Sequence, residues 1–259
     1  MHTLEQLRSG QLTGCTRLDL ACELQAFPTE IFSLADSLEV LNLSDNCLTS
    51  LPDDLPRLHK LRIIFCSNNQ FTELPAVLGC CTALQMIGFK SNQICQLPAA
   101  ALPVNLRWLI LTDNQLETLP VELGQCHRLQ KLMLAGNQLR QLPSSLAACQ
   151  NLELVRIAAN QLNELPDWLL NMPRLAWLAF AGNPFCAQTE AATLVTHLIA
   201  SIEWQQLSLA QVLGEGASGV IQQASWRAPN SEPREVAIKL FKGTVTSDGL
   251  PHSEMSACI

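Results

Sequence analysis

The amino-acid sequence predicts an α/β repeat solenoid, a horseshoe whose parallel sheet lines the concave face, followed by a shorter β segment of another kind. An asparagine recurs every 22 or 23 residues through most of the chain, and aliphatic residues keep fixed distances from it. A glycine-rich stretch begins after this period stops. A period of this length indicates stacked supersecondary units that share one core.

The composition is that of a chain that folds. The 259 residues are 48% hydrophobic and 15% charged, as in globular proteins. No apolar run approaches the roughly 18 residues of a membrane span, and the opening residues MHTLEQLRSG lack the features of a secretory signal. We therefore expect a soluble, cytoplasmic protein that does not act at a membrane.

Charge and cysteine usage exclude further classes of function. The net charge is −7, without the clustered Lys and Arg that nucleic-acid binding needs. The 11 cysteines are odd in number and include no Cys-x-x-Cys pair, and no His-Glu-x-x-His run occurs. We expect reduced thiols, no metal site and no nucleic-acid partner.

The repeat can be written L-x-x-L-x-L-x-x-N-x-L-x-x-L-P. A leucine lies eight residues before every asparagine, an aliphatic residue five before, and Leu, Ile or Phe two after. The pattern resembles the leucine-rich-repeat family over about residues 15 to 200, with a degenerate first copy from Leu18 to Pro28 that lacks the asparagine. The recurrent asparagines are Asn46, Asn69, Asn92, Asn114, Asn137, Asn160 and Asn183.

The alternation around L-x-L predicts a short strand in each copy, with the residues five and three before the asparagine facing inward. Stacking buries the aliphatic side chains, each worth about 1.5–3 kcal/mol. We assign the asparagines to structure, because a buried amide satisfies backbone groups at the turn. We assign Cys81, Cys126 and Cys149 to packing between neighbouring copies.

The residues six, four and two before each asparagine should point outward from the concave sheet. Many of them are apolar, and contiguous exposed apolar surface marks an interaction site. We therefore predict a protein or peptide partner on this face. Alternatively, a terminal segment or the remainder of a larger molecule covers the apolar residues. The candidate partner-binding residues are Phe65, Met86, Trp108, Met133, Arg156 and Trp177.

Three regions follow from these patterns. Residues 1–186 should form the solenoid, and residues 187–204 should form a C-terminal cap helix, over Ala187 to Ser201, and a linker. Residues 205–259 change character, with strand-like runs from 207 to 213 and from 220 to 226 on either side of Gly214-Glu215-Gly216-Ala217-Ser218-Gly219. A dinucleotide-binding motif would need a helix after the glycines, so these glycines are predicted to lie in a hairpin.

Together with Val236-Ala237-Ile238-Lys239, the glycine hairpin resembles the start of the protein-kinase family. The resemblance implies that Gly214, Gly216, Gly219 and Lys239 contact the phosphates of ATP, with Leu213, Ile221 and Ala237 around the adenine. Glu254 is the candidate partner of Lys239, although a solvated charge near the terminus is an equal alternative.

The sequence lacks H-R-D-x-x-x-x-N and D-F-G motifs, so this chain alone should not transfer phosphate. ATP with Mg²⁺ would serve the full-length family, and neither should bind this chain tightly. We expect residues 225–259 to be poorly ordered, because two or three strands have no core of their own.

Three functions remain open. The chain resembles the front of a cytosolic leucine-rich-repeat kinase, of Ser/Thr type, whose solenoid recruits a substrate or regulator. It could instead be a stand-alone adaptor or decoy with a vestigial kinase tail. A bacterial effector with another catalytic domain is a remote third interpretation.

Overall fold

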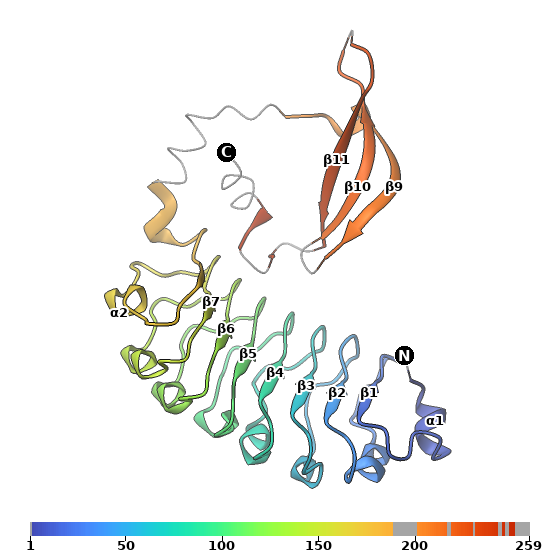
Figure 1. Cartoon of the computed structure of the whole chain (residues 1–259), viewed down its shortest axis with the longest axis vertical. Coiled ribbons are helices and arrows are strands. Elements are labelled where there is room, and N and C mark those ends of the chain that lie inside the picture. The colour runs from blue at the N-terminus through green and yellow to red at the C-terminus, as the bar shows by residue number, and fades with distance from the viewer. Residues whose placement is uncertain are drawn as a thin grey trace.

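The computed structural model describes residues 2–188, 201–216, 219–229, 231–242, 245–246 and 249–251. Within these ranges the chain forms a curved solenoid with an eight-stranded parallel sheet, and a separate three-stranded antiparallel sheet (Figure 1). Both sheets follow the order of the strands in the sequence, so no connection crosses another strand.

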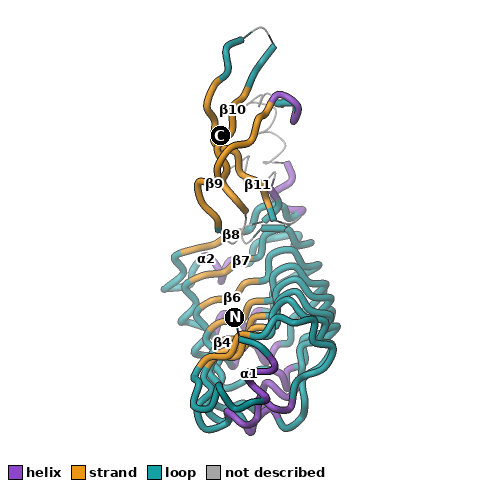
Figure 2. The backbone as a smooth tube through the Cα atoms, turned by 90° about the vertical axis from the view of Figure 1, so that its right-hand side faces the viewer, coloured by secondary structure: helices purple, strands orange, loops and turns teal. Residues whose placement is uncertain are grey.

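Each coil of the solenoid contributes one three-residue strand, and neighbouring strands pair in parallel without a register shift. The middle residue of β2 to β7 is buried and its two neighbours are largely half-exposed, which confirms the predicted alternation. Figure 2 shows these strands stacked along one side of the solenoid. The strands are β1 (Arg17–Asp19), β2 (Val40–Asn42), β3 (Ile63–Phe65), β4 (Met86–Gly88), β5 (Trp108–Ile110), β6 (Lys131–Met133), β7 (Leu154–Arg156) and β8 (Trp177–Ala179).

The return segments of the coils contain single helical turns that mostly begin after the proline of a Leu-Pro pair. Proline fixes φ near the helical value and lacks an N–H, so it suits the entry to a short helix. The turns are 3₁₀ helices at Thr29–Leu34, Leu55–Arg57, Ala76–Cys80, Ala99–Ala101, Val121–Gln125, Ser144–Ala148 and Pro184–Cys186, and the α-helix α2 at Asp167–Leu170.

The recurrent asparagines bind the backbone of adjacent coils, as predicted. Asn137 Nδ2 donates to the carbonyl oxygens of Leu111 and Leu134 at 2.9 and 3.0 Å, and Asn137 Oδ1 accepts from the Leu116 amide at 3.0 Å. The same pattern of bonds recurs along the solenoid, and six of the seven asparagines are buried. The side chains therefore form a ladder inside the solenoid.

A second recurrent feature precedes each asparagine. The residue before it adopts the left-handed conformation, with φ between 52° and 73° at Asp45, Asn68, Ser91, Asp113, Gly136, Ala159 and Gly182. Asp, Asn and Gly tolerate this conformation better than most residues, and they occupy five of these seven positions. The sequence therefore contains a signal for a left-handed turn residue, which the leucine repeat as written above leaves out.

Helix α1 (Leu4–Arg8) closes the first coil and was not predicted. Its N-cap Thr3 and Gln6 form a capping box, and Leu7 enters the core at 3% exposure. A Thr-x-x-Gln pair is a recognised helix start, so this element too had a signal in the sequence. The cap helix predicted over Ala187 to Ser201 lies largely outside the described residues.

The three-stranded sheet contains β9 (Leu207–Glu215), β10 (Gly219–Trp226) and β11 (Arg234–Phe241), in the order β11-β10-β9. A 3₁₀ turn at Trp204–Gln206 leads into β9. The predicted glycine hairpin between β9 and β10 is present, and Gly216 N donates to Gly219 O at 2.9 Å. The expectation of poor order from residue 225 is wrong for Arg234–Phe241, because this segment pairs with β10 along its whole length.

Candidate partner-binding face and nucleotide-binding sheet

The concave face carries two parallel rows of outward-facing side chains, set by the unshifted strand register. Adjacent strands lie about 4.8 Å apart, so side chains in one row touch their neighbours. We call the two rows the concave stripe. The first row is Val40, Ile63, Met86, Trp108, Lys131, Leu154 and Trp177, and the second is Asn42, Phe65, Gly88, Ile110, Met133, Arg156 and Ala179.

The register places the six predicted partner-binding residues on this one surface. Met86 lies beside Trp108, and Met133 lies beside Arg156. Trp177 is 52% exposed, and the other five are half-buried. An apolar surface that remains open to solvent fits an interaction site.

Trp108 has the best-defined surroundings of the predicted partner-binding residues. The Lys131 ammonium lies 3.7 Å from the centroid of its ring, which is a cation–π geometry. Trp108 also helps to line a hollow of about 170 Å³, together with Arg62, Ile63, Gln85, Met86 and Arg107. The hollow is large enough for one apolar side chain, and of the two arginines that line it Arg62 pairs with Glu39 at 3.6 Å.

Four positions predicted to face outward are in fact buried. Gly88 lies under the ring of Phe65, since a β-carbon at Gly88 would be 2.5 Å from Phe65 Cδ1. Thr112, Ala135 and Ala158 are at most 3% exposed. Strand alternation predicts the direction of a side chain, but its burial also depends on contacts with other residues, as for Gly88 under Phe65.

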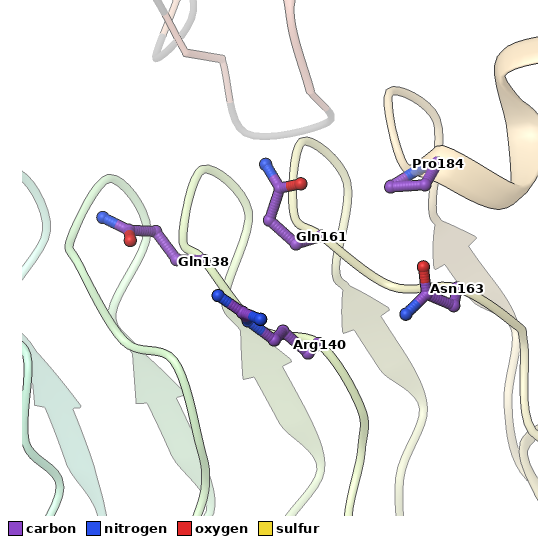
Figure 3. Close-up of a pocket in the computed structure, with 5 residues that line it drawn as sticks. All are labelled: Gln138, Arg140, Gln161, Asn163 and Pro184. Carbon is purple, nitrogen blue, oxygen red and sulfur yellow. The ribbon is translucent and has the colours of Figure 1, made fainter.

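A second hollow lies on the turns that follow the strands. It has a volume of about 410 Å³ and is lined by Gln138, Arg140, Gln161, Asn163 and Pro184, which Figure 3 shows spread over neighbouring coils. These residues stand one or three positions after the recurrent asparagines. The hollow is mainly polar and has no aromatic anchor, so it is a weaker candidate for a partner site than the concave stripe.

The three-stranded sheet brings several of the predicted nucleotide-site residues into one row. Gly214 pairs with Ile221, and Ile221 pairs with Lys239. Ala237 lies two residues from Lys239 along β11, so its side chain shares the same face. Leu213 is 54% exposed at the end of β9.

The three glycines differ in whether packing within the sheet requires a glycine at their position. A β-carbon at Gly219 would lie 2.4 Å from Leu240 O, so packing between β10 and β11 demands glycine there. A β-carbon at Gly214 or Gly216 would meet nothing within 4 Å, and neither residue has a positive φ. The described residues therefore give no internal reason for glycine at 214 and 216.

The Lys239 ammonium lies 4.6 Å from the centroid of the Phe241 ring. Glu254, its predicted carboxylate partner, lies outside the described residues. Next to the glycine turn, Lys242 Nζ lies 2.5 Å from Glu215 Oε1, and this bond lowers the pKa of Glu215.

The buried cysteines behave as core residues. Burial raises the pKa of Cys81, Cys126 and Cys149 to about 11, with a further contribution from a neighbouring cysteine at Cys81 and Cys149, and burial raises that of Cys66 further still. Among the described residues no cluster of His, Cys, Asp and Glu could hold a metal. No described helix combines the length and hydropathy of a membrane span.

The repeats match known sequence families. Residues 36–76 match the model for Leucine Rich repeats (2 copies), and residues 105–126 match the model for Leucine Rich Repeat. With the parallel sheet and the asparagine ladder, these matches support a leucine-rich-repeat fold for the solenoid. No curated protein sequence matches the chain.

Solved structures support the same fold. The chain is similar to the leucine-rich-repeat protein LIC12759 of Leptospira interrogans, with 29% identity, 68% of this chain and 45% of that one covered, and a TM-score of 0.63. It is also similar to the plant peptide hormone receptor RGFR1 in complex with RGF2, with 27% identity, 68% and 30% coverage, and a TM-score of 0.56.

An internalin of Listeria monocytogenes shares the fold, with 22% identity, 68% and 50% coverage, and a TM-score of 0.58. The alignments thus span half or less of each of these relatives. Neither family model reaches residues 205–259, so these matches give the kinase resemblance no support.

Proposed function

We propose that the solenoid recognises a protein or peptide partner along the concave stripe, and that residues 205–259 are the nucleotide-binding start of a cytoplasmic protein kinase. The solenoid then recruits a substrate or regulator for phosphorylation. The observation that carries the first part is the unshifted register that places Met86, Trp108, Leu154 and Trp177 in one row, with Lys131 among them. Leucine-rich-repeat proteins commonly bind proteins or peptides, and one similar structure is that of a peptide hormone receptor.

The chemistry of the stripe suits an extended peptide with apolar side chains and an acidic group. Trp108 and the hollow beside it accept an apolar side chain. Lys131 and Arg156 lie in the two rows of the stripe, and the arginines at 62 and 107 edge the hollow. Aromatic residues and arginine dominate binding energy at protein interfaces.

The partner site can be tested with peptides selected from a random library on the wild-type chain. Trp108→Ser should raise the Kd of the selected peptides at least 30-fold, about 2 kcal/mol for a hot-spot residue. Val104→Ser is the matched control, because Val104 is an apolar residue of the solenoid outside the strands that is 72% exposed. Unchanged binding by a folded Trp108→Ser variant would reject the concave site.

The kinase part is supported by the row Gly214, Ile221 and Lys239 and by the two glycines that packing does not explain. In protein kinases a glycine loop covers the phosphates of ATP, and a strand lysine contacts them. Glycine at 214 and 216 would let the backbone approach a phosphate closely. Lys239 would supply the positive charge, Leu213, Ile221 and Ala237 would surround the adenine, and Mg²⁺ would need ligands from elsewhere.

Two measurements test this part. An antibody against the solenoid should detect a native product much larger than 28.4 kDa, and Lys239→Ala should abolish its phosphorylation of itself or of a bound substrate. Arg234→Ala is the charge-matched control, since Arg234 lies at the far end of β11. A single native species of 28.4 kDa would favour a stand-alone adaptor.

A further inference from the structure

The chain returns to the solenoid after β11. A β-carbon placed on Gly136 would lie 2.5 Å from Val245 Cγ1, so Val245 sits directly over Gly136. A β-carbon placed on Gly249 would lie 3.1 Å from Ala158 Cβ and 3.7 Å from Ala181 O. The contacts therefore span three successive coils. In Figure 1 the short coloured pieces of chain after β11 lie near the turns that follow β6 and β7.

The solenoid surface at this place is made of small residues. Ala135, Gly136, Ala158 and Ala181 follow strands β6 to β8, and we call them the docking strip. Ala135 and Ala158 are fully buried, whereas Ser44 and Ser67 at the same position of earlier coils are half-buried. Side chains of this size let another segment of the chain approach the solenoid closely here.

Two of the residues that approach the docking strip region are hydrogen-bonded to each other. Thr246 is 1% exposed, and its amide and hydroxyl both donate to Gly249 O, at 2.7 and 2.9 Å. Gly249 has a φ of +136°, which only glycine adopts readily. This turn presents the Val245 side chain and the bare Gly249 backbone to the solenoid, so its shape matches the strip.

We propose that the docking strip is an internal binding surface of the solenoid, whose occupant is the part of this same chain that holds Val245, Thr246 and Gly249. The docked turn closes the strip to outside partners. It also holds the three-stranded sheet at a fixed place beside the concave stripe, because Val245 is only six residues beyond Lys239. The docking itself depends neither on the partner site nor on nucleotide binding. Its use in presenting a bound partner to Lys239 rests on the proposed function.

Limited trypsin digestion of the full chain tests the docking, since proteolysis of a native protein reports how often a segment opens. Ala158→Arg puts a large side chain into the contact with Gly249 and leaves the cleavage site unchanged. We expect cleavage after Lys242 to become at least 10-fold faster, with cleavage after Arg227 in the distant β10–β11 connection unaffected. Ser67→Arg is the matched control, because it makes the same change at the equivalent position of an earlier coil.

A double-mutant cycle covers the case in which Ala158→Arg disturbs the solenoid itself. Gly136→Ala should speed cleavage after Lys242 because its methyl group meets Val245. In a Val245→Ala background the same change should add less than 2-fold, since the two methyl groups it would strike are gone. The cost of alanine at the positive φ of Gly136 is common to both backgrounds and cancels.

Equal cleavage rates for Ala158→Arg, Ser67→Arg and the wild type, or equal effects of Gly136→Ala in both backgrounds, would overturn the docking. Neither result bears on whether Trp108 is needed for peptide binding, so the two proposals fail independently.

Discussion

Asn137→Ala should lower the free energy of unfolding by about 3–4 kcal/mol. The change removes two hydrogen bonds to carbonyl oxygens, of Leu111 and Leu134, and one from the Leu116 amide, all between 2.9 and 3.0 Å. Each bond contributes about 1 kcal/mol, and a buried donor left without a partner costs about 1–3 kcal/mol. The Leu116 amide is that donor, because its bond to Asn137 lies in the buried interior.

The two carbonyl oxygens lose less hydrogen bonding than the Leu116 amide, because each keeps another donor. Leu111 O keeps a bond from Asn114 at 3.0 Å, and Leu134 O keeps one from Asn160 at 2.9 Å. The loss should therefore stay below the sum of three fully unsatisfied groups. Asn137→Asp should cost at least as much as the alanine change, since a carboxylate can accept from the amide but repels the two carbonyl oxygens.

The assay is equilibrium unfolding in urea followed by far-UV circular dichroism, with Gln138→Ala as the control at the exposed neighbouring position. Cooperativity must be checked with a second probe, such as tryptophan fluorescence, because solenoids can unfold in parts. A loss below about 1 kcal/mol for Asn137→Ala, the value of a single ordinary hydrogen bond, would refute the idea that the ladder holds the coils together.

Two further predictions concern the return segments. Gly124→Ala should lower the free energy of unfolding by about 1–3 kcal/mol in the same assay, because its β-carbon would lie 2.3 Å from Ser145 O. The control is Ala147→Gly, at the equivalent position of the next coil, which should lower it by no more than about 1 kcal/mol. An unchanged stability of Gly124→Ala would show that the coils can move apart. Burial raises the pKa of Cys149 to about 11, so the unfolded thiol ionises first and stability should fall as pH rises from about 9 to 11. Cys149→Ser should reduce this fall in stability, whereas Cys80→Ser, at an exposed position, should not. The measurement compares urea midpoints at pH 8 and pH 10.5. Equal falls in both variants would contradict ionisation of Cys149 as the cause.

Much of the solenoid was predictable because its contacts repeat with the sequence. Leu41 and its counterparts lie at one place in every copy, and each lies beside another aliphatic residue in the next coil. The asparagine ladder was predictable for the same reason. The left-handed residue before each asparagine and the capping box of Thr3 and Gln6 are also encoded locally, although neither forms part of the leucine repeat that predicts the fold.

The concave stripe was partly predictable. Strand alternation gave the direction of Phe65, Met86, Trp108, Met133, Arg156 and Trp177, and the parallel register gave their neighbours. Alternation could not reveal that Phe65 covers Gly88, because that contact depends on the rotamer of a side chain in the adjacent coil.

The sequence by itself determined the period, the strands, the buried aliphatic core and the glycine hairpin, because each depends on residues within one or two copies. Only the tertiary structure decided the cover of Ala158, since the covering residue, Gly249, lies far along the chain. The same holds for the glycines of the hairpin, where packing against Leu240 explains Gly219 and no described contact explains Gly214 or Gly216. Contacts between distant segments leave no periodic pattern in a sequence. These contacts determine which surfaces of the folded protein remain open to a partner.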